Sequence, residues 1–363
     1  MRRKFSMKKI TFLLFLVSFV SVAQHNEDTA VKKNPEEKSL KVTIKEYINH
    51  HLLDSYDFGL YSFTDDHGKT IHRGLPLPII LWDGGLKVFL SSKFHHGETV
   101  AEVDGSYYKV DHNKIYKTDA SGVITYDAEH HATNVKPLDF SITKNVVFIF
   151  LVGLLMFFMF TRMAKNYKKN ALPKGMGRLL EPVILYIRDD IAIPNIGKKH
   201  YKRYMSYLLT VFFFVWIINL LGLTPLGVNV TNNIAVTFAL ALITFVITNF
   251  TANKNYWKHI FWMPGVPKLM RIVLAPIELL AIFIKPFSLM IRLYANITAG
   301  HIVLMSIIGL MFVFKSWIGS PLSFGLAFAL SLLELLVAAL QAYIFTMLSA
   351  LYFGSAVEEH DDH

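Results

Sequence analysis

Residues 285–301 read KPFSLMIRLYANITAGH. The stretch lies in a long apolar region with the composition of a membrane-spanning segment, yet it contains Arg292. A guanidinium in hydrocarbon costs at least about 2.5 kcal/mol on insertion scales, and it cannot lower that cost by losing its charge. Apolar segments on both sides also make it difficult for this side chain to reach the headgroups. We therefore interpret Arg292 as a fixed positive charge that function requires at membrane depth.

Apolar stretches dominate the chain after about residue 143. Three of them are long enough for one span each: Asn145–Thr161, Tyr204–Leu223 and Asn233–Phe250. The fourth, Ile272–Phe353, is interrupted by the polar segment Lys315–Pro321, and such a break predicts two long helices in a hairpin. Each arm exceeds a perpendicular span, so we expect both to be tilted. The sequence thus predicts an all-α polytopic membrane protein with five membrane helices ending in a long tilted hairpin.

Basic residues between the expected spans indicate the orientation. The connection Arg162–Arg203 contains eleven lysines and arginines and three acidic residues, and Thr251–Arg271 contains four basic residues and no acid. Short connections rich in lysine and arginine stay in the cytoplasm. Five spans then place the C-terminal tail, residues 358–363, in the cytoplasm and the segment before the first span outside.

The N-terminal part of the chain has the features of an exported segment. Basic residues precede the apolar run Ile10–Val20, and the small residues Ser21-Val22-Ala23 follow it. The run is too short to span a bilayer, which favours a signal peptide over residues 1–23 rather than a retained anchor. Residues 24–142 are then an exported, mixed α/β domain, and residues 143–357 form the membrane domain.

Turn signals divide the exported segment into short strands. After a helical pattern at Val42–Leu53, alternating runs are separated by Gly-containing turns, which predicts a small β-rich domain of antiparallel strands. The turns are Asp83-Gly84-Gly85, His96-Gly97, Asp104-Gly105 and Ser121-Gly122.

Histidines are frequent in the exported segment, and they raise the possibility of a membrane-tethered metal-binding protein. Residues 24–142 contain ten, including His50-His51, His95-His96 and His130-His131. Adjacent residues of a strand point to opposite faces, which favours solvated surface, so we predict no metal site. The chain has no cysteine, which excludes disulfides and thiolate ligands.

Polar residues inside the predicted hairpin are candidates for function. They are Glu278, Lys285, Arg292, Asn296, His301, Glu334 and Gln341. An antiparallel hairpin folded about residue 317 brings His301 beside Glu334. The same fold brings Arg292 beside Gln341, so a single choice of turn predicts two polar pairs.

The two predicted pairs differ in their chemistry. Glu334 and His301 are both titratable, so the couple can hold or pass a proton; a structural ion pair between two helices is the alternative. Gln341 can orient a guanidinium by hydrogen bonding without neutralising it. Arg292 and Asn296 lie one turn apart, Glu278 lies about 40° from Arg292, and His301 lies about 180° round the helix from it. Arg292 and His301 are therefore expected to face different surroundings.

Several of these segments resemble subunit a of the rotary F-type ATP synthase. The long run Pro286 to His301 resembles the signature of that family, PIELL at 276–280 resembles the segment before it, and LQAYIF at 340–345 resembles the motif of its last helix. Weaker matches are NLLGLTP at 219–225 and the helix start at Thr237. The resemblance covers about residues 140 to 357.

The resemblance implies a role for each of the polar residues. Arg292 corresponds to the essential arginine that faces the ring of c subunits, and Asn296 and Gln341 match polar positions near it. The family holds an acid and a histidine at the positions of His301 and Glu334, and here the two members are exchanged.

The resemblance also implies a mechanism with two half-channels. A proton enters past Glu334 and His301, neutralises a c-subunit carboxylate, and leaves to the cytoplasm past Glu278 after the ring has turned. Arg292 prevents a direct shortcut. The chain is then a non-catalytic subunit without a cofactor in the bacterial inner membrane, and no GxxxxGK[ST] loop is present. Its implied partners are the c ring, the peripheral-stalk b subunit and membrane lipid, with no nucleic acid.

A secondary transporter with a buried arginine that binds an anionic substrate is the alternative function. Transporters of this type are built from repeated halves around a central solute site, and this sequence shows no such repeat.

Overall fold

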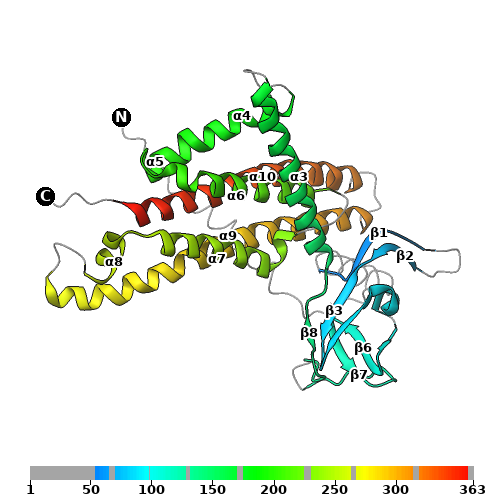
Figure 1. Ribbon diagram of the computed structural model, residues 1–363. Helices are drawn as coiled ribbons and strands as arrows, with labels where there is room; N and C mark the ends of the chain where they lie inside the picture. The colour runs from blue at the N-terminus through cyan, green and yellow to red at the C-terminus, as the bar shows by residue number, and fades with distance from the viewer. Residues whose placement is uncertain are drawn as a thin grey trace, which may run out of the picture. The chain divides into compact units, whose positions relative to one another are not determined.

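The computed structural model describes eight stretches of the chain (Figure 1). They are residues 54–64, 70–97, 99–127, 131–169, 175–224, 230–262, 267–313 and 319–358. The expected signal peptide, the expected helix at Val42–Leu53 and most of the break at Lys315–Pro321 lie outside these residues.

Short antiparallel strands make up most of the described chain between residues 54 and 140, which confirms the predicted β-rich domain. The strands are β1 (Asp57–Thr64), β2 (Thr70–Pro76), β3 (Pro78–Trp82), β4 (Leu86–Leu90), β5 (Ala101–Val103), β6 (Ser106–Asp111), β7 (Lys114–Thr118) and β8 (Leu138–Asp139), with a 3-10 segment η1 (Ser91–Gly97). They form the pair β1-β2 and two three-stranded sheets, in the orders β4-β3-β8 and β5-β6-β7. The inward faces of these two sheets share one core, in which Ile79, Leu81, Phe94, Tyr108 and Ile115 are almost fully buried.

Two tight turns fix the register of the second three-stranded sheet. Asp104 and Gly105 connect β5 to β6 with φ of 50° and 73°, and His112 and Asn113 connect β6 to β7 with φ of 45° and 58°. Two successive positive φ values are typical of a type I′ turn, whose twist matches that of the flanking strands. The Asp104-Gly105 turn is confirmed, whereas the second turn contains no glycine and was not predicted.

Within the described residues, five helices are long and apolar enough to cross a membrane, which agrees with the five predicted spans. They are α3 (Lys144–Lys169), α6 (Tyr201–Gly222), α7 (Ile234–Thr251), α9 (Lys268–Val313) and α10 (Gly319–Val357). The last two pack against each other, and Figure 1 shows them running side by side. At 1.5 Å per residue the 46 residues of α9 extend for about 69 Å, well beyond the thickness of a bilayer.

The basic connection between the first two spans is helical rather than irregular. It contains α4 (Met176–Tyr186), a π-helical turn η2 (Ile187–Ala192) and α5 (Ile193–Ile196). Leu180, Ile187 and Ile191 are buried, whereas the charged residues between them face outward. The segment is therefore amphipathic, and its apolar side packs against α6 and α10.

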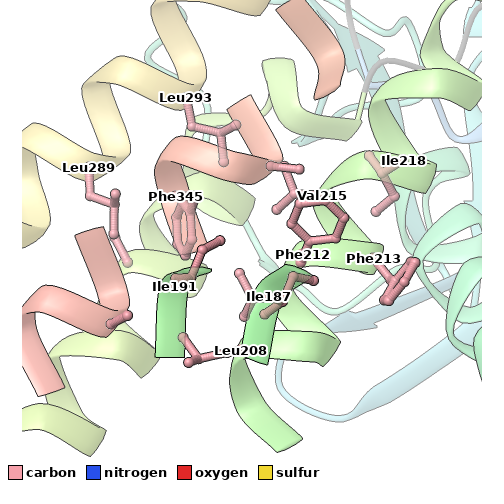
Figure 2. Packing of buried hydrophobic residues seen from close by; sticks show 14 of the residues in the cluster. Ile187, Ile191, Leu208, Phe212, Phe213, Val215, Ile218, Leu289, Leu293 and Phe345 are labelled. Carbon is pink, nitrogen blue, oxygen red and sulfur yellow. The ribbon is translucent and has the colours of Figure 1, made fainter. Parts of the chain in front are cut away.

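The core of the helical part forms around α6. Leu208, Phe212 and Val215 of α6 pack with Ile187 and Ile191 of η2, and side chains of α9 and α10 complete the cluster (Figure 2). Both η2 and α10 contact α6 directly, and α10 also packs against α9. The core therefore helps to position α10, which carries Glu334 and Gln341, beside α9.

Candidate functional site

Glu334 is a buried carboxyl on α10 that lies against α9. Its side chain is 8% exposed, and neither carboxylate oxygen has a hydrogen-bond partner within the described part of the chain. A Cβ atom added to Gly300 of α9 would lie 3.0 Å from Glu334 Oε1, so the carboxylate occupies the space that this glycine leaves open. Gly300 immediately precedes His301, whose backbone continues α9 and whose side chain lies outside the described residues. The contact matches the level at which an antiparallel fold about residue 317 places Glu334.

Gln341 lies two turns further along α10, on the same buried face as Glu334. Its side chain is 2% exposed, and its Nε2 has no acceptor among the described residues. An amide that is buried without partners costs about 1–3 kcal/mol, so it is a functional candidate rather than a filler of the core. The predicted contact between Gln341 and Arg292 stays a prediction.

Arg292 lies on α9 between two buried leucines of the core. Leu289 and Leu293 point into the cluster around α6 (Figure 2), whereas Arg292 is half-buried. Asn296, one turn further on, is exposed. The exposed apolar side chains of this stretch include Phe287 and Ile291. Arg292 thus borders an apolar surface of the helix pair that nothing in the described chain covers.

Glu278 lines a cavity of about 200 Å³ between the first part of α9, the short helix α8 (Lys254–Phe261) and the end of α10. His259 of α8 and Lys285 of α9 also line it, as does Glu358, which directly follows α10. The cavity therefore contains several groups that can hold or exchange protons.

A narrow second cavity continues from the first toward Arg292. Lys285 borders both cavities, and its Nζ lies 5.6 Å from the ring centroid of Tyr352 on α10. The second cavity is also lined by Leu289, which is one helical turn from Arg292. Two cavities that share Lys285 therefore lie between the Glu278 group and Leu289.

Arg292 separates the two titratable groups along α9. Gly300, which marks the level of Glu334, is eight residues or about 12 Å beyond it, and Glu278 is fourteen residues or about 21 Å before it. The candidate residues are thus not gathered into one site. Glu334 and Glu278 lie at two separate levels of the helix pair, with Arg292 between them.

Hydrogen bonds brace α9 near Gly300. Thr298 of α9 donates to Asn232, and the neighbouring Thr231 donates to Asn219 of α6 at 2.9 Å. Asn232 and Thr231 belong to the short segment η3 (Val230–Asn232), which leads into α7. These bonds connect the Glu334 level of α9 to the second and third spans.

Sequence reasoning missed two contributors to these groups. Gly300 was part of the quoted motif, but its importance comes from a contact with a helix 34 residues away in sequence. His259 lies in a connection that was analysed only for its charge. Its position on α8, opposite Glu278, could have been found only by recognising Lys254–Phe261 as a short amphipathic helix.

Comparison with known sequences divides the chain into two matched regions. Residues 146–354 match the family described as ATP synthase A chain. Residues 47–140 match a family described only as a domain of unknown function, DUF8433.

Individual relatives give the same result. A protein named ATP synthase subunit a from Chloroherpeton thalassium is 44% identical over 62% of this chain and 69% of its own length. A protein of the same name from Myxococcus xanthus is 43% identical over 62% of this chain and 77% of its own length. One named ATP synthase subunit a 2 from Prosthecochloris aestuarii is 37% identical over 80% of this chain and 93% of its length.

Proposed function

The chain belongs to the family of subunit a of the F-type ATP synthase, and on that premise we propose that it conducts protons through two half-channels that meet at Arg292. It is a multi-pass membrane protein, and its family implies association with the c ring and the other subunits of the complex. Family membership replaces the alternative of a secondary transporter. ATP chemistry belongs to other subunits.

One observation carries the proposal of two paths: Arg292 lies on α9 between two separate titratable groups. The entry path contains Glu334 and His301, where a buried carboxyl without a hydrogen-bond partner in the described chain is ready to accept a proton from the aqueous side. The exit path contains Glu278 and the cavities that lead toward Leu289. Neither path crosses the membrane alone.

Arg292 acts in this mechanism as an electrostatic barrier. It favours the ionised form of a c-subunit carboxylate that passes the apolar surface of the helix pair, and it repels a proton that would move directly between the paths. Asn296 supplies an exposed amide one turn from Arg292, and Gln341 supplies a buried amide on α10. Each proton that crosses a potential of 100 mV supplies about 2.3 kcal/mol for rotation of the ring.

Charge supports the orientation of the chain. We infer from the eleven basic residues of Arg162–Arg203 that the amphipathic connection α4–η2–α5 lies on the cytoplasmic surface, together with the C-terminal tail. The β-rich domain, residues 24–142, is then exported behind a signal peptide at residues 1–23, and the protein lies in the bacterial inner membrane. The cytoplasmic surface of α4–η2–α5 is available to the peripheral-stalk b subunit. The long arms α9 and α10 are tilted to fit the bilayer.

Replacement of the arginine tests the proposal. Arg292→Ala is expected to abolish proton-driven ATP synthesis in proteoliposomes while the complex remains assembled, because the barrier between the paths is lost. Arg271→Ala, at the start of the same helix, is the matched control and should retain synthesis. Normal synthesis by an assembled Arg292→Ala complex would contradict the proposal.

A further inference from the structure

The β4-β3-β8 sheet exposes a face that contains no charged side chain. Its six most exposed members, which we call the apolar sheet face, are each 50–65% exposed: Trp82, Leu86, Val88, Leu90, Leu138 and Phe140. The strands alternate, so that Ile79, Leu81 and Phe89 are buried on the opposite side. A sheet with one solvated face normally carries polar residues there. An exposed apolar patch of this kind indicates an interaction surface.

The register shows that these side chains form one continuous surface. Trp82 pairs with Leu86 on one side and with Leu138 on the other, and Val88 pairs with Ile80. Phe140 N donates to Ile80 O at 2.9 Å, which places Phe140 in line with the Ile80–Val88 pair. The patch therefore extends across all three strands.

The chain connects this face directly to the first membrane helix. Phe140 is four residues before Lys144, where α3 begins, and four residues span at most about 14 Å. Two backbone N–H groups tighten the junction: Lys144 N donates to Ser55 O at 3.1 Å, and Asn145 N donates to the side-chain Oδ1 of Asp54 at 3.3 Å. The Phe140 edge of the apolar sheet face therefore lies close to the start of the first membrane helix.

The lipid-facing surface of α3 continues the same chemistry. Phe150, Leu154 and Phe157 are 56–73% exposed on this membrane span, and in the bilayer lipid covers them. The first of them is only ten residues beyond Phe140. Exposed apolar side chains thus occur on the sheet and, beyond the polar junction at residues 141–145, again on the span.

The composition of the face favours lipid over a protein partner. Protein interfaces make about one hydrogen bond per 100–200 Å², but the only hydrogen-bonding side chain in this patch is the indole of Trp82. Tryptophan is enriched where the acyl region meets the headgroups, because its ring is apolar and its N–H is polar. We propose that the apolar sheet face rests on the lipid surface at the Lys144 end of α3, with Trp82 and Phe140 at the boundary between headgroups and acyl chains.

Single cysteines can test this contact because the chain has none of its own. Val88→Cys and Phe140→Cys, each carrying a bimane fluorophore, are compared in the assembled complex in proteoliposomes, with the cysteines of other subunits replaced. Glu102→Cys, on an exposed position of β5, is the aqueous control, and Phe150→Cys is the lipid control. All four side chains are exposed, so the labels do not disturb a core.

Quenching of the bimane fluorescence by nitroxide-labelled lipids and by iodide distinguishes a lipid-covered face from a solvated or protein-covered one. Lipids with a nitroxide near the headgroup should quench the Val88 and Phe140 labels at least threefold more than the Glu102 label, and iodide should show the reverse order. Equal quenching of the Val88 and Glu102 labels by iodide would show a solvated face and overturn the proposal. If neither agent reaches the Val88 label, a protein subunit covers the face, and the proposal is equally wrong. None of these outcomes depends on the proposed half-channels.

Discussion

At the scale of single residues, the chemistry depends on what surrounds two carboxyl groups. Glu334 is buried between two helices, and the absence of a Cβ at Gly300 leaves room for its carboxylate. Glu278 borders a cavity large enough for several water molecules and near other titratable groups. One carboxyl can therefore hold a proton away from solvent, and the other can exchange its proton with water.

Gly300→Ala tests the packing around Glu334. The added Cβ would lie 3.0 Å from Oε1, so the carboxylate must move away from its position beside Gly300. We expect the rate of proton-driven ATP synthesis to fall on the order of tenfold in a complex that still assembles. That change is equivalent to about 1.4 kcal/mol in the activation free energy. Gly325→Ala on α10 is the control, since nothing lies within 4 Å of a Cβ added there. Equal rates in the two variants would refute this account of Gly300.

Much of the candidate site could be predicted at this scale, but its surroundings could not. Arg292 and Glu334 were recognisable because charged groups in apolar stretches are expensive. The level of Glu334 followed from one choice of hairpin turn. The cavity around Glu278 was not predictable, because it forms where α8 and the start of α9 meet the end of α10, about 80 residues further along the chain.

At the scale of elements, the helical connection α4–η2–α5 supports the last helix. Gly354 of α10 lies so close to Asn195 of α5 that a Cβ added to it would be 1.9 Å from the Asn195 carbonyl oxygen. Asn195 Nδ2 in turn donates to Ile191 O at 2.7 Å. The backbone of the connection therefore packs directly on α10.

Gly354→Ala should weaken the packing of α5 on α10. The clash is with backbone, which cannot move as a side-chain end can, so we expect a loss of about 1–3 kcal/mol in stability. Hydrogen exchange of the amides in residues 187–197 should be at least tenfold faster than in the Gly325→Ala control. Unchanged protection of that segment would show that the close approach is not needed.

Sequence analysis predicted the charge of this connection but not its helices. Buried Leu180, Ile187 and Ile191 recur at spacings of seven and four, which is a helical pattern. Pro182 and Pro194 lie within the segment, and proline inside a helix normally ends or kinks it. Packing on α6 and α10 compensates for the lost hydrogen bonds, and such tertiary contacts are not visible in the sequence.

At the scale of the whole molecule, Asp54 joins the β-rich domain to the helices. Its carboxylate accepts from Asn145 at the start of α3 and from Asn233 Nδ2 at the start of α7, the latter at 3.4 Å. Its backbone carbonyl accepts from Asn113 in the β6–β7 turn at 2.9 Å. One residue thus contacts three parts of the fold, and no sequence motif indicated it.

Asp54 should make this junction sensitive to pH. Burial raises the pKa of Asp54 above its ordinary value of 3.8, against the lowering effects of hydrogen bonds from Thr143 and Asn145 and of the charge of Lys144. The folded state therefore binds a proton more tightly than the unfolded state. Its stability falls as pH rises from 3.8 through the raised pKa, and is constant below and above that window.

Asp54→Asn isolates this effect, because the amide keeps an acceptor for Asn145 N and cannot ionise. Hydrogen exchange at residues 143–147, corrected for intrinsic rates between pH 4 and pH 8, should show a loss of opening free energy with rising pH in the unmodified chain and none in the variant. The same pH dependence in both would exclude Asp54 as its source.

The sidedness of thiol labelling tests the two half-channels most directly. Ala338→Cys places a thiol one turn from Glu334 on the same buried face of α10, and Ser355→Cys places one in the Glu278 cavity. Each is exposed, in turn, to a membrane-impermeant thiol reagent on one side of sealed vesicles that contain the assembled complex. We predict that the Ala338→Cys thiol reacts only from the side of the β-rich domain, and the Ser355→Cys thiol only from the opposite side. Reaction of both thiols from one and the same side would contradict two half-channels separated by Arg292.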